Sequence, residues 1–233
     1  MLITEKDINY FLFCQYFYKN FARKNDKTNC FTPTTTEQAI SFDLVNSIFN
    51  NEYFDKTPIS AEQIMHLFNK SVDKKDRQRM NSVYMSAIAV WSEYIDKIWE
   101  NNYRVIAKDL ELMVVIGKIN YSVTIPWLLL KPDESLLPIY ISDTSAKWNK
   151  SMRYGNLALQ RSNDIVQKEF SVISISETGR ILFNTYPIIR KDLVNAEREV
   201  VMFGSAMRDE SLYYPNLNNC HSCEKKMECR LNV

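Results

Sequence analysis

The chain has 233 residues, of which 45% are hydrophobic, 12% aromatic and 24% charged. This composition is typical of a folded globular protein and excludes a disordered chain. Four glycines and seven prolines exclude collagen-like and low-complexity sequences. The net charge of +1 excludes a strongly basic protein that coats nucleic acid, but it leaves a local basic groove open because it does not say where the charges lie.

The sequence also indicates a compartment. It lacks the run of about 18 apolar residues that a membrane helix needs, and residues 1–7 carry acidic side chains where a signal peptide is basic and then apolar. Five cysteines fit poorly with a closed set of disulfides. We therefore expect a cytoplasmic protein without a membrane partner, and the Asn- and Lys-rich composition suggests a viral or bacterial source.

Helices are expected in the first hundred residues. Thr4 and Asp7 resemble a capping box at the start of a helix, and Ser60 is a typical N-cap residue. Apolar residues at helical spacing are clearest in the last of these helices. The predicted helices span residues 5–22 and 37–50, the segment after Ser60, and residues 76–100, with residues 23–36 as a loop.

Strand-like runs rich in Val, Ile and aromatic residues follow, together with two later amphipathic segments. We expect strands at 103–107, 110–116, 119–130, 136–142, 170–176 and 180–186, helices at 153–168 and 190–208, and an irregular tail from residue 213. Residues 177–179 (Glu-Thr-Gly) are typical of a hairpin turn between the last two strands. This order predicts an α/β or α+β fold in a single domain, residues 1–233. Residues 1–100 are mainly helical in this prediction, 101–188 form the sheet core, and 189–233 hold a helix and the cysteine-rich tail.

The strongest chemical signal is a cluster of three cysteines in the tail, Cys220, Cys223 and Cys229. Thiolates that are this close in the sequence can converge on one soft metal centre, either zinc or an iron–sulfur cluster. A fourth ligand must come from elsewhere, with Cys14, Cys30 and His221 as candidates. The alternative is a set of free thiols, but unpaired cysteines seldom cluster so tightly.

Both ends of the chain resemble a known family. Cys14 follows a tyrosine- and phenylalanine-rich segment, and residues 213–216 (Tyr-Tyr-Pro-Asn) precede Cys220. In these features the chain resembles the CRISPR-associated, RecB-type iron–sulfur exonucleases of the PD-(D/E)-x-K nuclease superfamily. The resemblance implies a mixed sheet flanked by helices. It also implies a [4Fe–4S] cluster, held by Cys14, Cys220, Cys223 and Cys229, that joins the two terminal segments, with Cys30 as the alternative to Cys14.

The resemblance also implies a divalent metal site, which this chain carries in altered form. Where the family has Gly-x-Ile-Asp, the chain has Gly117-Lys118-Ile119-Asn120, and where the family has Asp-x-Lys, it has Asp143-Thr144-Ser145. Asp143 therefore matches the second acid, while Asn120 replaces the first acid and Ser145 replaces the lysine. Asp143 and Asn120 would hold Mg²⁺ or Mn²⁺, but a neutral amide binds such a cation more weakly than a carboxylate does.

Relocated residues could restore the site. Lys147 lies an even number of residues from Asp143, and Lys118 lies two residues before Asn120, so either lysine would share a face with its acid or amide on a continuous strand. Glu111 or Asp109 could supply another acid. The structural alternative is that both lysines are solvated, since lysine is seldom buried, and that residues 143–145 form only a turn or an N-cap.

Three functions are compatible with the sequence. The first is a RecB-like nuclease-fold protein with a degenerate catalytic site that binds DNA, single-stranded or at ends, or serves as a scaffold in a DNA-processing protein complex. The second is an active, metal-dependent nuclease with a relocated lysine. The third is a structural zinc-binding module that mediates protein contacts and does not bind nucleic acid.

Overall fold

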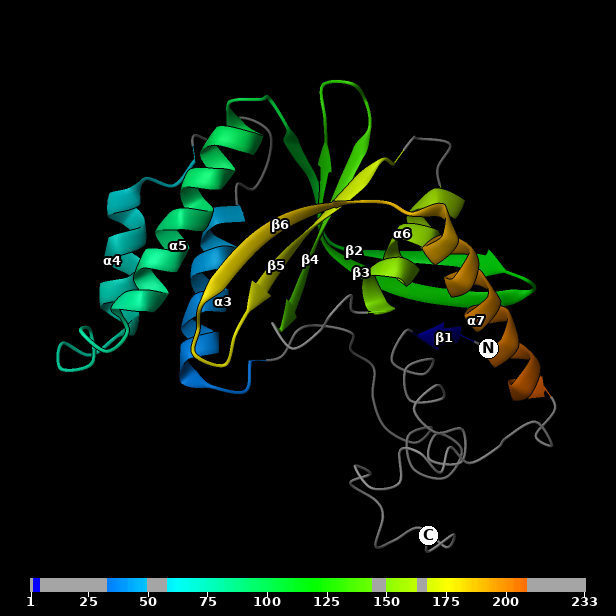
Figure 1. Cartoon of the computed structure of the whole chain (residues 1–233), viewed down its shortest axis with the longest axis horizontal. Helices are drawn as coiled ribbons and strands as arrows, with labels where there is room; N and C mark the ends of the chain where they lie inside the picture. The colour runs from blue at the N-terminus through cyan, green and yellow to red at the C-terminus, as the bar shows by residue number, and fades with distance from the viewer. Residues whose placement is uncertain (1, 5–32, 50–57, 144–149, 163–166, 209–233) are drawn as a thin grey trace, which may run out of the picture.

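The computed structural model describes residues 2–4, 33–49, 58–143, 150–162 and 167–208. In this part of the chain, one six-stranded mixed sheet lies between two groups of helices (Figure 1). The strands are β1 (Leu2–Thr4), β2 (Arg104–Ile116), β3 (Ile119–Leu130), β4 (Leu136–Asp143), β5 (Glu169–Ile175) and β6 (Ile181–Pro187). The helices are α3 (Thr36–Phe49), α4 (Ala61–Ser71), α5 (Asn81–Tyr94), the π-helix η2 (Ile95–Trp99), α6 (Lys150–Ser162) and α7 (Arg190–Arg208).

Helices α3, α4 and α5 cover one face of the sheet. Their buried side chains form one cluster with Trp127 and Leu129 of β3, Ile139 of β4 and Ile173 of β5. Helix α4 begins where the sequence predicts, because Ser60 accepts from the Gln63 main chain and Gln63 accepts from the Ser60 main chain in a capping box. The helix expected at 76–100 begins later, at residue 81, and its last turn is the π-helix η2.

Helices α6 and α7 cover the opposite face. Helix α7 lies very close to the β2–β3 hairpin, since a Cβ atom on Gly204 would overlap Ile119 Cδ1, and one on Gly117 would lie 2.7 Å from Val201 Cγ2. Two glycines therefore permit this packing. Helix α6 spans 150–162 rather than the expected 153–168, and Gln167 and Lys168 belong to the connection to β5.

Strand β3 is shared by three neighbours. Strand β2 runs antiparallel along it, from Arg104 opposite Leu130 to Ile116 opposite Ile119. On its other side, β4 pairs only with residues 127–130, and β1 pairs in parallel with residues 120–122. Strand β4 continues instead beside β5, where Asp143 is opposite Ile175. The first half of β3 and the second half of β4 therefore diverge.

An irregularity divides the β2–β3 hairpin into two halves. The ladder passes from Lys108 opposite Trp127 to Leu110 opposite Ile125, skipping Asp109 and Pro126. Proline has no N–H to donate, and Asp109 takes a φ of 48°. The buried face changes at this point: Ile125 packs on the side of α6, whereas Trp127 packs on the side of α3. One strand in the structure thus replaces the two expected at 103–107 and 110–116.

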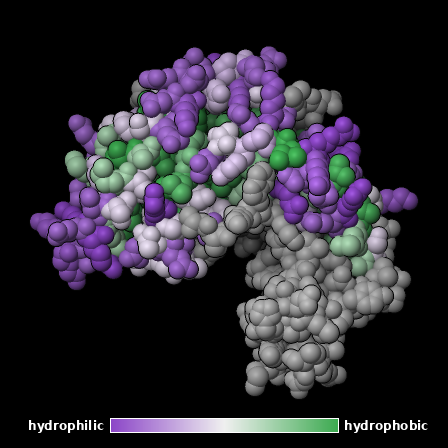
Figure 2. Space-filling view, viewed as in Figure 1, coloured by the Kyte–Doolittle hydropathy of each residue, from purple (hydrophilic) through white to green (hydrophobic). Residues whose placement is uncertain are grey.

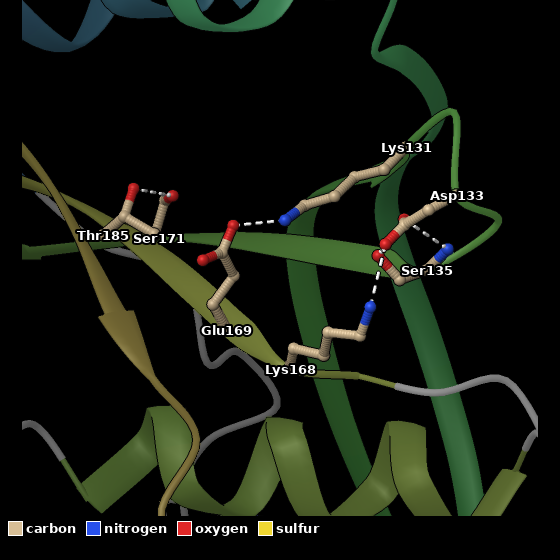
Figure 3. A network of polar contacts seen from close by, with 7 residues as sticks. All are labelled: Lys131, Asp133, Ser135, Lys168, Glu169, Ser171 and Thr185. Carbon is tan, nitrogen blue, oxygen red and sulfur yellow. Dashed lines mark hydrogen bonds and ion pairs between the residues drawn. The ribbon is translucent and has the colours of Figure 1, made fainter.

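Charged contacts fix the end of the sheet at the β3–β4 turn (Figure 3). Lys131 is nearly buried, pairs with Glu169 and lies 5.4 Å from the centre of the Tyr103 ring. Lys168 Nζ lies 2.9 Å from a carboxylate oxygen of Asp133. Hydrogen bonds from Ser135, and then the Lys168 ammonium, hold the pKa of Asp133 well below its usual value.

Most of the later elements form where the sequence predicts them. The strands from β3 onward, the hairpin turn at Gly179 (φ 75°) and α7 are confirmed. Thr4, expected as a helix cap, instead ends strand β1, which the sequence did not indicate. The helix expected at 5–22 lies outside the described residues, as do the tail and all five cysteines.

Candidate functional site

The two predicted metal ligands lie at the same end of the sheet. Asn120 is the second residue of β3, and Asp143 is the last residue of β4. Because β3 and β4 are antiparallel, the start of one strand and the end of the other lie at the same end of the pair. This is the end at which the two strands diverge, opposite the turn shown in Figure 3.

The two residues also face the same side. Ile139 and Ile141 pack with the α3 cluster, so Asp143, which follows at the same spacing, points to the α3 side. Ile119 and Tyr121 pack against the helices on the other side, so Asn120 between them points to the α3 side as well. Both side chains are exposed. Asn120 and Asp143 thus point to the same side of the sheet, but the structure does not bring them together. Strand β4 pairs with β3 only at residues 127–130, β1 pairs with β3 beside Asn120, and the end of β4 lies apart from the start of β3 (Figure 1).

Strand β2 contributes further groups to this face. Glu111 is opposite Thr124, Met113 is opposite Ser122, and Val115 is opposite Asn120. Residues opposite each other in an antiparallel ladder share a face. Glu111 is therefore an exposed acid on the same face as Asn120, separated from Asp143 by strand β3.

The structure tests one of the two lysines that were predicted to replace the missing one and does not describe the other. The prediction that Lys118 shares the face of Asn120 is wrong, because the strand does not extend that far back. Gly117 and Lys118 form the two-residue turn between β2 and β3, with φ values of 54° and 69°. Lys147 and Ser145 lie outside the described residues. Asp109 lies in the irregularity opposite Pro126 rather than in the alternating part of β2.

Gln38 is a residue at this end of the sheet that no sequence motif identifies. It is 3% exposed, and its Nε2 donates to the Ile175 carbonyl, 3.2 Å away, while its Oε1 accepts from Thr34. Ile175 is the neighbour of Asp143 across β4 and β5. Gln38 thus fixes the start of α3 next to the strand end that carries Asp143. The only sequence signal was a polar residue among the apolar ones of a helix.

A basic connection lies beside the start of α3. The segment between α4 and α5 carries exposed Lys74 and Lys75, and Arg79 lies 3.4 Å from Glu37 of α3. The Arg77 guanidinium donates to the carbonyls of Asn69 and Val72. Figure 2 shows a hydrophilic surface over this part of the molecule. The two exposed lysines therefore place positive charge at the same end of the molecule as Asp143.

The cysteine site falls outside what the structure describes. Cys14, Cys30, Cys220, Cys223 and Cys229 all belong to the undescribed segments. Within the described ranges, no group of three or more His, Cys, Asp or Glu side chains is placed to hold a metal ion. Among these same residues, no helix combines the length and hydrophobicity that a membrane span requires.

Comparison with known proteins gives a likeness of fold. No family model matches the sequence, and no curated protein matches it. A crystal structure from Eubacterium rectale, that of a protein named "Putative exonuclease", aligns with a TM-score of 0.53 and 11% identity, over 98% of this chain and 88% of that one. The structure of the protein SSO0001 aligns over 98% and 96% of the two chains at 9% identity, with a TM-score of 0.35 that supports no conclusion. The chain therefore has a mixed α/β fold of nuclease-like type, and the likeness extends to the fold alone.

Proposed function

We propose that this chain is a nuclease-fold protein that binds nucleic acid across the face carrying Asn120 and Asp143, with little or no catalytic activity of its own. The observation that carries the proposal is the placement of these two side chains on one face of diverging strands, inside a nuclease-like fold. The sequence indicates the loss of catalysis, because an amide replaces one acid and Ser145 replaces the lysine.

We propose that a divalent cation binds only weakly at this face, with Asp143 as its charged ligand, because the structure does not place Asn120 beside Asp143. Asp143 offers an exposed carboxylate, a ligand that Mg²⁺ and Mn²⁺ accept. A bound cation would offset the negative charge of a nucleic-acid phosphate at this face. One carboxylate supplies less charge than two, so affinity for the cation would be low and DNA binding would depend mainly on basic side chains.

Nucleic-acid binding is tested with the two exposed lysines of the α4–α5 connection, Lys74 and Lys75. We expect single-stranded DNA to bind with an affinity that falls as salt rises, because phosphate contacts release counterions. Changing both Lys74 and Lys75 to glutamine should weaken binding and reduce the salt slope by about one for each lysine that touches a phosphate. Lys131→Gln is not a suitable control because that lysine is nearly buried. Lys97→Gln, an exposed lysine in η2, is suitable and should leave binding unchanged.

We further propose that Cys14, Cys220, Cys223 and Cys229 hold a [4Fe–4S] cluster. The support is the spacing of the three tail cysteines and the position of Cys14 near the other end of the chain. Protein purified without oxygen should contain about four irons per chain and absorb broadly near 400 nm, as expected for a thiolate-held cubane. One zinc and no iron would instead favour a structural zinc module, and the absence of DNA binding would strengthen that alternative.

An active nuclease is the second candidate, and the position of Glu111 favours it. Glu111 is an exposed acid on the face of Asp143 and lies opposite Thr124, four residues along β3 from Asn120, so in this candidate it takes the place of Asn120 as the second ligand. Metal-dependent cleavage of DNA that is lost in both Asp143→Ala and Glu111→Gln would establish this function and contradict the degenerate site. Activity that is equal in the wild type and in Asp143→Ala would come from a contaminant.

A further inference from the structure

A second polar site lies on the opposite side of the sheet, between α6 and α7. A cavity of about 610 Å³ opens there, lined by Leu157, Gln160 and Arg161 of α6 and by Arg190, Leu193 and Glu197 of α7. Gln167, in the connection to β5, also lines it. Since the Asp143 face is covered by α3 and this cavity lies on the α6–α7 side, the two sites are separate.

Side-chain contacts join α6 and α7 at two places, one at each end of the stretch 154–161 of α6. At the first, the Tyr154 hydroxyl donates to Glu199, and Arg153 Nη2 lies 3.7 Å from the same carboxylate. At the second, Arg161 pairs with Glu197, and both side chains are partly exposed. The cavity therefore lies between the second half of α6 and the first half of α7, with a volume in the range of small-molecule sites.

The lining has a distinct chemistry. Among the lining residues that the structure describes, two arginines and one glutamate leave a positive charge, and the buried Leu157 and Leu193 contribute apolar surface. The first turn of α7 carries Arg190, Lys191 and Asp192, so its side chains leave one positive charge at the helix start. Guanidinium groups bind phosphate oxygens with good geometry.

The two glutamines add hydrogen-bonding groups suited to a base. Gln167 Nε2 donates one hydrogen to Asn156, which leaves its carbonyl oxygen and its second N–H to contact a ligand. Gln160 is exposed and can both donate and accept. A glutamine amide pairs well with the edge of adenine, which has a donor and an acceptor side by side.

We propose that this cavity binds a single adenine nucleotide through its phosphate and its base. Arg190 and Arg161 contact the phosphate, the leucines pack against the sugar and ring, and the glutamines contact the base edge. The nucleotide is either free or the terminal one of a phosphorylated DNA chain, since both present the same groups.

The test is calorimetric titration of the full chain with adenosine 5′-monophosphate in the presence of EDTA, so that a metal at the Asp143 face plays no part. Arg190→Gln should weaken binding by about tenfold or more, as expected when a charged hydrogen-bond pair is lost. The matched control is Lys191→Gln, which removes the same charge one residue away from a side chain outside the lining, and it should change the affinity much less. Melting curves of each variant establish that it folds.

Glu197→Gln gives a second signature, because it removes the only negative charge among the described lining residues and releases Arg161. The affinity should rise in this variant and fall in Arg190→Gln, a pair of opposite changes that general destabilisation would not produce. Tighter binding of a 5′-phosphorylated oligonucleotide than of the free nucleotide would identify a DNA end as the source. Equal affinity for adenosine, or for inorganic phosphate, or equal effects of Arg190→Gln and Lys191→Gln, would overturn the proposal.

Discussion

The side-chain amide of Gln38 donates to the carbonyl of Ile175, and this bond ties the first turn of α3 to the end of β5. Ile175 is in turn the partner of Asp143 in the β4–β5 pair. Ser41 of the same helix donates to the Gly179 carbonyl in the β5–β6 turn, and the apolar residues of α3 pack into the cluster on the sheet, so the Gln38 bond is the polar contact nearest to Asp143. The position of Asp143 therefore depends on a buried amide that has no reactive chemistry of its own.

Gln38→Met keeps the length of the side chain and removes its hydrogen bonds. The main-chain carbonyl of Ile175 and the hydroxyl of Thr34 lose a hydrogen-bond partner. The free energy of unfolding should therefore be about 1–3 kcal/mol lower than in the wild type. Denaturant unfolding monitored by circular dichroism gives the value. The control is Gln78→Met, an exposed residue whose change should stay within about 0.5 kcal/mol. Equal effects of the two variants would show that the Gln38 bonds contribute nothing to stability.

Gly204→Ala tests the close packing of α7 on the hairpin. Helix propensity alone would favour alanine by about 1 kcal/mol. The added methyl group, however, would overlap Ile119 Cδ1 and Cγ1, atoms of a buried β-branched side chain that has little room to move. We expect the packing cost of about 1–3 kcal/mol to exceed the gain, so that thermal unfolding occurs at a lower temperature. Ser205→Ala, next to it and exposed, is the control. A stabilised Gly204→Ala protein would mean that α7 lies farther from Ile119.

The sequence predicts those parts of the fold that a short run of neighbouring residues determines. The Ser60–Gln63 capping box and the turn at Gly179 are local patterns, and both form as expected. The position of Lys118 could not be predicted, because alternation assumes a strand and only the backbone shows that the turn occupies residues 117–118. The divergence of β3 and β4 also depends on β1, which pairs with β3 from more than a hundred residues away. Pairing at that separation leaves no pattern in either segment.

The candidate site was predictable only in part. Asn120 and Asp143 could be identified by resemblance to the family motifs, and the structure places them on one face but does not bring them together. The register of β2 against β3 places Glu111 on the same face as these two residues, and hydrophobic alternation alone does not fix that register. Gln38 was missed because its role comes from its partner on β5 rather than from its own segment.

The stability of the protein should depend on pH through the ionisation of Asp133. Its pKa is held below the usual value by Ser135 and Lys168, so the folded state prefers the ionised form more than the unfolded chain does. This contribution is fully present above the unfolded-state pKa of about 3.9 and is lost as the pH falls below it. Asp133→Asn should therefore reduce stability at pH 7 and flatten the loss of stability on acidification. The free energy of unfolding is measured in urea between pH 2 and 7 for the wild type and for Asp133→Asn. The control is Glu134→Gln, which changes an exposed acid in the same turn. Parallel curves for the wild type and Asp133→Asn would contradict this role.

The affinity for Mn²⁺ tests the central claim most directly, because the claim is that the family's two-ligand cation site is lost and that Asp143 alone holds a cation weakly. Electron paramagnetic resonance of free Mn²⁺ would be measured with the wild type, Asn120→Asp and Asp143→Ala, and with Asp96→Ala, an exposed acid in η2, as the control. Asn120→Asp should leave the affinity close to that of the wild type, since residue 120 lies apart from Asp143, while Asp143→Ala should abolish binding. Asp96→Ala should behave as the wild type. If Asp143→Ala binds Mn²⁺ as the wild type does, Asp143 holds no cation and the proposed role of this face is wrong. If Asn120→Asp binds Mn²⁺ about tenfold more tightly, the two residues share a site and the two-ligand arrangement is not lost.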